Sequence, residues 1–326
     1  MTEEHSASDQ MSQFTHRPLK VLVSGAGIAG PCLATLLTSA TAVASAPSKV
    51  PVHVTVVERA PAPRPHGQNV DIRGKGIDVV ARMGLLSAVR AQNTTEAGIN
   101  FVDANNKVKA SFPVLKGGGG FTSEFEIMRG TLAQIFYDAS LNGKGADGNV
   151  RYLFGETIKA IHEEADGARI EFANGAAGDK FDVVVGADGL GSSVRRLAFP
   201  DAGRDVFKPL GQIAAFFQIP LGPTDGPMAR WYNAPQRRCI FLRPDNVGTT
   251  RALLSIINKD DRLRSVLKSG AGTDSSEGVK KQKALIREFF EDAGWEAQRV
   301  MEGMDKAEDF YMQEVAQAMR DIAPHP

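Results

Sequence analysis

The sequence predicts a mixed α/β protein, with a parallel sheet near its N-terminus and an antiparallel sheet in a second domain. An apolar run over residues 21–23 leads directly into a glycine-rich segment, 25–30, and an Ala- and Leu-rich stretch follows it. That order of strand, glycine loop and helix is typical of Rossmann-like domains that bind dinucleotides. Four further runs with strand character, between residues 213 and 257, predict the antiparallel sheet.

Each glycine of the segment has an expected task. Gly25 allows a tight turn, Gly27 leaves no side chain between the backbone and a pyrophosphate, and Gly30 lets the helix pack close to the strand. The helix predicted over residues 31–37 then offers free N–H groups and a partial positive charge to phosphates. Glycine-rich turns are common, so an ordinary turn is the competing interpretation.

A second strand is expected over residues 52–57, and it ends at Glu58. A carboxylate at this position can accept hydrogen bonds from ribose hydroxyls. Glu58 follows Gly30 by 28 positions, whereas the usual spacing is roughly 20. We therefore expect an inserted loop over residues 41–51, which are small and include proline.

Composition narrows the class of protein. A chain of 326 residues can form one large domain or two smaller ones. Lys and Arg together number 38, as do Asp and Glu, so net charge gives no case for a nucleic-acid or anionic-membrane partner. Cys32 and Cys239 form no CxxC motif, which fits a cytoplasmic protein. No apolar run approaches the roughly 18 residues of a membrane span, and residues 1–18 are expected to be a disordered tail.

Between the second strand and residue 141, two helices, a hairpin and a short run before the second helix are expected. Residues 76–89 have apolar side chains at helical spacing and predict one amphipathic helix. Residues 100–114 predict a hairpin that turns at Asn105-Asn106. A short run over residues 125–129 then leads into a helix over residues 131–141.

The stretch 150–185 contains three strand-like runs, with turns at Asp166-Gly167 and Asn174-Gly175. Such turns are strong hairpin signals and predict a small antiparallel meander. The stretch ends in a buried-type strand over 181–185. Ser192 or Ser193 is then expected to cap a short helix.

From residue 205 the expected elements belong to the second domain. Its strands are predicted over 213–219, 229–232, 238–242 and 251–257, and its helices over 281–293 and 295–304. The predicted organisation is a tail (1–18), a dinucleotide-binding domain (19–204), an antiparallel-sheet domain (205–294) and the start of a return to the first domain (295–326).

Three segments in one order carry a family resemblance: GAGIAG with VVERA, then EIMRGTLAQIFYDA, then DVVVGADGLGSSVRR. Together they resemble the single-component FAD monooxygenases of the p-hydroxybenzoate hydroxylase type, and most of all the tetracycline-inactivating and polyketide-tailoring branch. The resemblance covers about the first 200 residues. The later run RWYNAPQRRCIFLRPD is similar to that branch as well, though less distinctively.

The resemblance implies FAD as cofactor and places residues around it. The three glycines would hold the pyrophosphate and Glu58 the adenosine ribose. Asp188 and Gly189 would form the family's DG motif, which relatives use toward both FAD and the nicotinamide cofactor. The remaining expected cofactor-binding residues are Arg59 beside Glu58, Asp71 and Arg73 along the isoalloxazine edge, and Arg129 on the flavin side.

Plainer interpretations stay open for several of these side chains. Arg129 precedes a helix and could be a solvated surface charge. Asp188 could be an ordinary turn aspartate, and Arg73 is equally compatible with a structural role. His66 and His162 are expected to be surface histidines, and no spacing suggests a metal site.

The resemblance also implies a reaction. NAD(P)H would reduce the flavin, O2 would add at its C4a atom, and the hydroperoxide would transfer one oxygen atom to an aromatic or polyketide-like small molecule. The protein would position the substrate and exclude water. No catalytic side chain is assigned.

One family motif is not found. The run 309–317 is similar to the lead-in to a GD-containing strand in relatives, yet no Gly-Asp pair follows it. This predicts either a C-terminally truncated chain or a site that another chain completes. The alternative function is a non-catalytic protein of the same fold with impaired FAD binding. A flavin halogenase is disfavoured because Trp231 and Trp295 stand alone, and a plain NAD dehydrogenase would leave EIMRG and the DG motif without a role.

Overall fold

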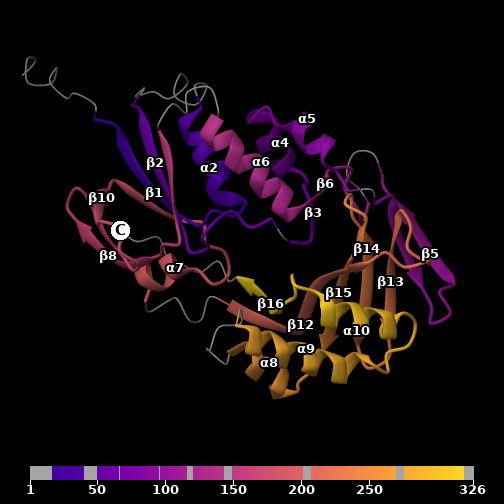
Figure 1. Ribbon diagram of the computed structural model, residues 1–326. Coiled ribbons are helices and arrows are strands. Elements are labelled where there is room, and N and C mark those ends of the chain that lie inside the picture. The colour runs from indigo at the N-terminus through magenta and orange to yellow at the C-terminus, as the bar shows by residue number, and fades with distance from the viewer. Residues whose placement is uncertain are drawn as a thin grey trace, which may run out of the picture. The chain divides into compact units, whose positions relative to one another are not determined.

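The computed structural model describes residues 17–39, 50–65, 67–94, 96–115, 120–142, 149–200, 207–268 and 275–318. The chain divides into two compact units, each described by itself below (Figure 1). The first comprises Met1–Arg64 and Ala133–Pro200, and the second comprises Pro65–Leu132 and Asp201–Pro326. Most of the predicted tail and of the predicted loop 41–51 lies outside the described residues.

A four-stranded parallel sheet forms the centre of the first unit, as predicted. Its strands are β1 (Leu19–Ser24), β2 (Val52–Glu58), β7 (Val150–Phe154) and β11 (Val183–Gly186), in the order β11-β1-β2-β7. Helix α2 (Ala29–Thr38) packs on one face, where Ala34 joins a core with Val21 and Val23. Helix α6 (Arg129–Asn142) touches α2 through a hydrogen bond from the Thr35 hydroxyl to the Phe136 carbonyl, 3.4 Å long.

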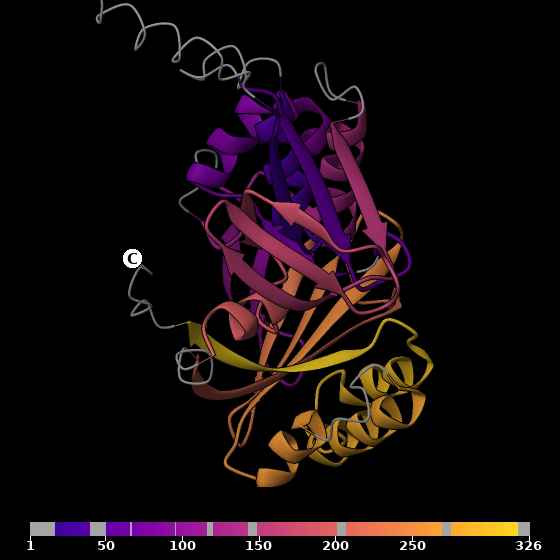
Figure 2. The same ribbon diagram turned by 90° about the vertical axis from the view of Figure 1, so that its left-hand side faces the viewer.

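The other face of this sheet is covered by the antiparallel meander (Figure 2). The meander consists of β8 (Ile158–Glu164), β9 (Gly167–Phe172) and β10 (Asp179–Phe181), so both predicted turns are confirmed. The outer runs of the stretch, β7 and β11, instead pair in parallel with β2 and β1 and form the two edges of the four-stranded sheet. The run 181–185, predicted as a buried-type strand, is only partly buried, since Val183 is 43% exposed at the sheet edge. Ser192 caps α7 (Ser193–Ala198), accepting a 3.0 Å hydrogen bond from the Arg195 amide.

The second unit is built on a seven-stranded sheet in the order β16-β12-β15-β14-β13-β4-β5. Its strands are β4 (Gly98–Val102), β5 (Val108–Pro113), β12 (Phe207–Pro220), β13 (Met228–Ala234), β14 (Arg238–Pro244), β15 (Thr249–Ile257) and β16 (Tyr311–Ala318). The four predicted strands are confirmed, and so is the hairpin β4–β5 with Asn106 in its turn at φ 61°. All neighbours are antiparallel except β13 and β4, which run parallel.

Three helices cover one face of this sheet: α8 (Asp261–Lys268), α9 (Ser276–Phe290) and α10 (Ala297–Lys306) (Figure 1). Alternation along β12 turns Phe217 toward them, and Ile286 and Phe290 of α9 pack in the same fully buried core. The opposite face carries Phe101, Trp231 and Phe241 from three adjacent strands.

The remaining part of the second unit comes from residues 65–132. Strand β3 (Asn69–Asp71) pairs antiparallel with β6 (Glu126–Met128), and the helices α4 (Lys75–Arg82) and α5 (Leu86–Ala91) lie between them in sequence. The single helix predicted over residues 76–89 is wrong. Gly84 separates α4 from α5 at φ +71°, a conformation that a continuing helix cannot adopt.

Residues 65–132 group with the second unit, although the predicted first domain ran through them to residue 204. The reason is long-range pairing, since β4 and β5 extend the sheet of the second unit through β13. Likewise β16 lies at the edge of that sheet beside β12, in the stretch predicted to start a return to the first domain. Within the described residues, no helix is long and apolar enough to cross a membrane.

Candidate cofactor-binding site

The glycine loop begins where β1 ends, at the carboxyl edge of the parallel sheet. Gly25 has φ +108°, and its amide donates a 2.7 Å hydrogen bond to the Val57 carbonyl. A Cβ at this position would lie 2.6 Å from the Ala187 carbonyl oxygen. Both the conformation and the close approach of the 187–188 backbone therefore require glycine here.

The other two glycines differ in what surrounds them. A Cβ at Gly30 would lie 1.9 Å from the Gly25 carbonyl oxygen, so helix and loop pack too closely for any side chain. A Cβ at Gly27 would meet nothing within 4 Å, and Gly27 has no left-handed φ. The fold itself therefore needs Gly30 but gives no reason for Gly27.

This contrast is the test of whether the loop fits a dinucleotide. An open glycine is what a pyrophosphate needs in order to approach the backbone. The N-terminus of α2 has Ile28 at its cap and no side-chain hydrogen bond there, so its amide groups can bind phosphate oxygens. The loop fits the pyrophosphate of FAD on both counts.

Glu58 lies at the end of β2 and is hydrogen bonded to the glycine loop. One carboxylate oxygen accepts a 2.9 Å bond from the Ala26 amide, and the other accepts a 2.9 Å bond from the Ala60 amide. Each carboxylate oxygen has two lone pairs, so one site on each remains for ribose hydroxyls. Glu58 thus orients the loop as well as offering an acceptor, whereas Arg59 is exposed beside it.

Asp188 lies directly behind the loop. Its Oδ2 accepts hydrogen bonds from the Ser193 amide (2.8 Å), the Ser193 hydroxyl (3.0 Å) and the Ser24 hydroxyl (3.3 Å). Burial alone would raise the pKa of Asp188, but hydrogen bonds from nearby hydroxyls and amides outweigh it and hold the pKa below the ordinary value. Its Oδ1 is buried and has no hydrogen-bond partner among the described residues, and Gly189 is exposed at φ +73°.

Asp188 is an ionised carboxylate with one buried oxygen that has no partner among the described residues, and a role beyond that of a turn aspartate remains a prediction. Within the first unit, the structure brings Asp188, Glu58 and the three glycines to one edge of the sheet. Sequence reasoning did not identify Ser24 as a partner of Asp188. The only signal was its position as the last residue of β1, next to the glycine loop.

Asp71 and Arg73 belong to the second unit, where both are engaged with the segment 120–123. The Asp71 carboxylate accepts a 2.7 Å hydrogen bond from the Ser123 amide. The Arg73 guanidinium donates 2.7 Å bonds to the Gly120 and Phe121 carbonyls. These contacts hold residues 120–123 in place, and a role of Asp71 and Arg73 beside the flavin remains a prediction.

Arg129 is exposed at the junction of β6 and α6. Its amide donates a 3.0 Å hydrogen bond to the Gln68 carbonyl, and a Cβ at Gly67 would lie 2.9 Å from the Arg129 Cβ. Arg129 is therefore packed closely against residues 67–68, just before β3. Its guanidinium makes no hydrogen bond or ion pair to the described residues, so it is available to a ligand.

Sequence reasoning missed a buried ionic cluster next to Arg129. We call it the Glu126 cluster, and it consists of Asn69, Thr94, Glu96, Glu126 and Arg243. Arg243 bonds Glu96 at 2.7 Å and also pairs with Glu126, and both glutamates are buried. The signal in the sequence was a charged residue in the buried strand Glu126–Met128.

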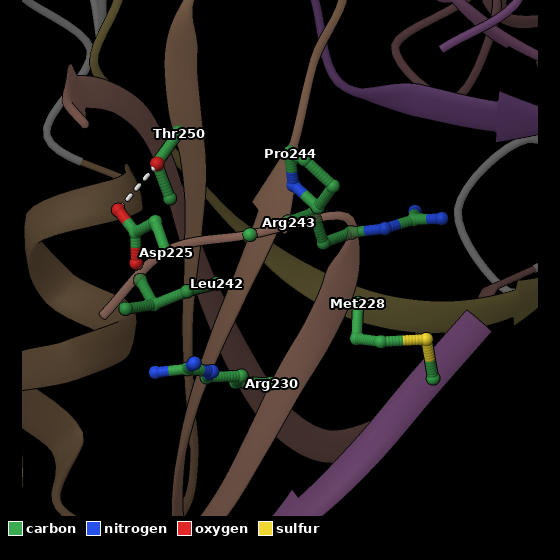
Figure 3. A pocket seen from close by; sticks show the side chains of 8 residues that line it. Asp225, Met228, Arg230, Leu242, Arg243, Pro244 and Thr250 are labelled. Atoms are coloured by element: carbon green, nitrogen blue, oxygen red, sulfur yellow. Dashed lines mark hydrogen bonds between the residues drawn. The ribbon is translucent and has the colours of Figure 1, made fainter. Parts of the chain in front are cut away.

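A small pocket opens at the ends of β13, β14 and β15 (Figure 3). It leaves essentially no room for even a water molecule, and at one side the Thr250 hydroxyl donates a 2.6 Å hydrogen bond to Asp225. Pockets that take drug-sized ligands span about 300–1,000 Å³. This one is too small for FAD or a polyketide. Its lining residues are Asp225, Gly226, Met228, Arg230, Leu242, Arg243, Pro244 and Thr250.

Known protein families and solved structures include matches to this chain. Residues 18–264 match the family described as FAD binding domain. The FAD-dependent monooxygenase asL4 of Sarocladium schorii is 33% identical over 310 aligned residues, which cover 93% of this chain and 66% of that protein. Monooxygenase CTB7 of Cercospora beticola is 33% identical over 311 residues, covering 93% of this chain and 69% of that protein.

Among solved structures, the crystal structure of the tetracycline destructase Tet(51) is similar, with a TM-score of 0.70 and 26% identity. That similarity covers 94% of this chain and 72% of the destructase. The chain thus spans about two thirds of the length of its relatives. Because the family match extends over most of the chain and includes the glycine loop and Asp188, the chain belongs to the FAD-binding domain family, with FAD-dependent monooxygenases as relatives.

Proposed function

We propose that this chain binds FAD and, in the cytoplasm, uses NAD(P)H and O2 to hydroxylate an aromatic or polyketide-like small molecule. One observation supports this most strongly: Gly27 is open on its outer side, whereas Gly25 and Gly30 are required by the fold. The fold alone does not explain Gly27, but a bound pyrophosphate does.

The chain's own residues would act mainly by binding and orienting the cofactor. FAD supplies the redox chemistry when bound. The amides at the start of α2 would bind the pyrophosphate, and Glu58 would accept hydrogen bonds from the adenosine ribose. Asp188, whose Oδ1 is buried, would act from behind the loop by holding the Ser24 hydroxyl and the Ser193 amide in place. Arg129 would contribute a positive charge on the flavin side.

The substrate surface would be the face of the seven-stranded sheet opposite α8–α10. Six side chains lie in register across it, one from each of six neighbouring strands, and five of them are aromatic. We call this set the aromatic row. In order along the sheet it consists of Tyr311, Phe216, Leu253, Phe241, Trp231 and Phe101.

The rings of the aromatic row form two contacting groups, and Leu253 lies between them. Ring centroids are 4.9 Å apart for Phe216 and Tyr311, 4.8 Å for Trp231 and Phe241, and 5.8 Å for Trp231 and Phe101. Aromatic faces and edges bind other rings at such distances, and each contact is worth about 0.5–1.5 kcal/mol beyond buried area. A planar polycyclic substrate matches this surface better than a compact or charged one.

Binding of FAD is the first test. Purified chain is titrated with FAD, and quenching of flavin fluorescence gives the affinity and stoichiometry. Gly27→Val should abolish binding, because a branched side chain would fill the approach of the pyrophosphate. Gly226→Val is the matched control, since a Cβ at Gly226 also meets nothing within 4 Å but lies in the second unit. Equal affinity of the Gly27 variant and the parent chain would refute the site.

The reaction needs a separate test. NAD(P)H oxidation is followed with a panel of phenolic polyketides, and incorporation of label from 18O2 into the product is measured by mass spectrometry. Trp231→Ala should lower turnover while FAD affinity stays unchanged, because Trp231 belongs to the aromatic row and not to the glycine loop. FAD binding without any labelled product would favour the non-catalytic alternative.

A further inference from the structure

The Glu126 cluster places two buried carboxylates on a single guanidinium. Arg243 donates to Glu96 through Nε (2.7 Å) and Nη2 (3.2 Å), and the same Nη2 pairs with Glu126. The side chains of Glu96 and Glu126 are 0% and 3% exposed. One cation cannot neutralise two carboxylates, so a proton can replace the missing positive charge.

The contacts of Glu126 allow it to carry that proton. Its Oε1 accepts a 2.5 Å hydrogen bond from the Thr94 hydroxyl and a 2.7 Å bond from the Asn69 amide. A hydroxyl can reverse from donor to acceptor, so Thr94 can accept from a protonated Glu126 without any movement of the chain. Burial is the largest cause that raises the pKa of Glu126, and the charge of Glu96 adds to it; against the attraction of Arg243 they bring the pKa to about 7.

The cluster lies where β6 meets the residues expected to face the cofactor. Glu126 is directly opposite Asp71 in the β3–β6 pair, and Arg129 follows β6 immediately. Around Glu126, charged side chains come from each neighbouring element: Arg243 from β14, Glu96 from the segment before β4, and Asp71 from β3 with Arg73 paired to it. Three carboxylates and two guanidinium groups thus share this site.

We propose that Glu126 is a positioning residue: through the Glu126 cluster it holds β6 and hence Arg129 in place, and loss of one proton from the cluster loosens this hold and speeds release of the cofactor. The direction follows from linkage. A carboxyl that is buried when β6 is docked and solvated when β6 opens ionises more easily in the open state, so rising pH favours opening. The link to cofactor release rests on the proposed function above.

The test measures opening of β6 in the chain without FAD, by hydrogen exchange of the amides of residues 126–129 read by mass spectrometry. After correction for intrinsic exchange, the opening constant should rise about twentyfold from pH 5.5 to 7.5, if the Glu126 pKa moves from about 7 in the docked state to 4.5 in the open state. In Glu126→Gln, whose amide resembles the protonated acid in shape and charge, the constant should stay flat.

A matched control comes from the neighbouring strand. Arg251 also lies between two buried carboxylates, Asp245 (3.2 Å) and Asp309 (3.0 Å). Asp309 accepts its hydrogen bonds from the Gln218 amide of β12 and from Arg251 of β15. Asp309→Asn is the same acid-to-amide change, and in this variant the opening constant of β6 should depend on pH as it does in the parent chain. If Glu126→Gln keeps the parent response, or if Asp309→Asn removes it equally, the proposal is wrong.

A second experiment measures the rate of FAD release, from the recovery of flavin fluorescence after dilution of the loaded chain. The rate should rise with pH in parallel with the opening constant in the parent chain and stay flat in Glu126→Gln. If hydrogen exchange depends on pH but the rate of FAD release does not, Glu126 has only a structural role. That result would overturn the positioning role. If the chain binds no FAD, the proposed function fails, while the exchange comparison still decides whether Glu126 controls β6.

Discussion

Replacing Gly27 and Gly30 separately by alanine should show which glycine the stability of the fold requires and which one FAD binding requires. In Gly30→Ala the new Cβ would lie 1.9 Å from the Gly25 carbonyl oxygen, although real Cβ contacts essentially never fall below 3.0 Å. Relief requires the backbone of loop or helix to move by more than 1 Å. Overpacking of this kind costs about 1–3 kcal/mol or more, and we expect a loss of about 3 kcal/mol in the free energy of unfolding.

Gly27→Ala should behave in the opposite way. Its Cβ meets nothing within 4 Å and its φ is not left-handed, so the free energy of unfolding should stay the same or rise by about 0.4–1 kcal/mol because the unfolded chain loses entropy. The methyl group would nevertheless occupy the approach of the pyrophosphate. FAD affinity should fall about tenfold or more, equivalent to about 1.4 kcal/mol.

Two measurements on each variant give the comparison: urea unfolding without FAD and FAD titration by fluorescence. We expect Gly30→Ala to lose stability and Gly27→Ala to lose only its affinity for FAD. A Gly27→Ala chain that unfolds as easily as Gly30→Ala would show that the loop is closed on its outer side. A Gly27→Ala chain with parent affinity would remove the main support for the cofactor site.

Three further predictions concern other contacts. Glu58→Ala should weaken FAD binding by about 1–3 kcal/mol; tighter binding of NADPH than of FAD by the parent chain would contradict this assignment. The raised pKa of Glu126 stabilises the fold at low pH, so the free energy of unfolding of the parent chain should fall by about 2 kcal/mol between pH 5.5 and 8. The Glu126→Gln variant should not show this fall. Asn106→Ala should lower the free energy of unfolding by about 1–3 kcal/mol. Asn106 accepts a 3.1 Å hydrogen bond from the Trp295 indole, and its backbone has a left-handed φ of 61°. Asn106→Gly isolates the hydrogen bond, and unchanged urea midpoints in both would refute that contact.

Local sequence patterns determined much of the first unit. The order of apolar run, glycine loop and helix predicted β1, the loop and α2, and the Asp166-Gly167 and Asn174-Gly175 turns predicted the meander. The glycines themselves also marked the candidate site. Each of these signals lies within about ten residues of chain, where turn geometry and helix packing depend on neighbours in sequence.

Only the tertiary structure decided which long-range partners meet. The parallel pairing of β4 with β13 moved residues 65–132 into the second unit. Glu96, Glu126 and Arg243 come together over distances of 30 to 147 positions, and no local pattern links them. The order and register of the strands determine these contacts. Strand order and register depend in turn on how whole strands pack their buried faces. A buried charge then survives only where that packing also supplies its partner.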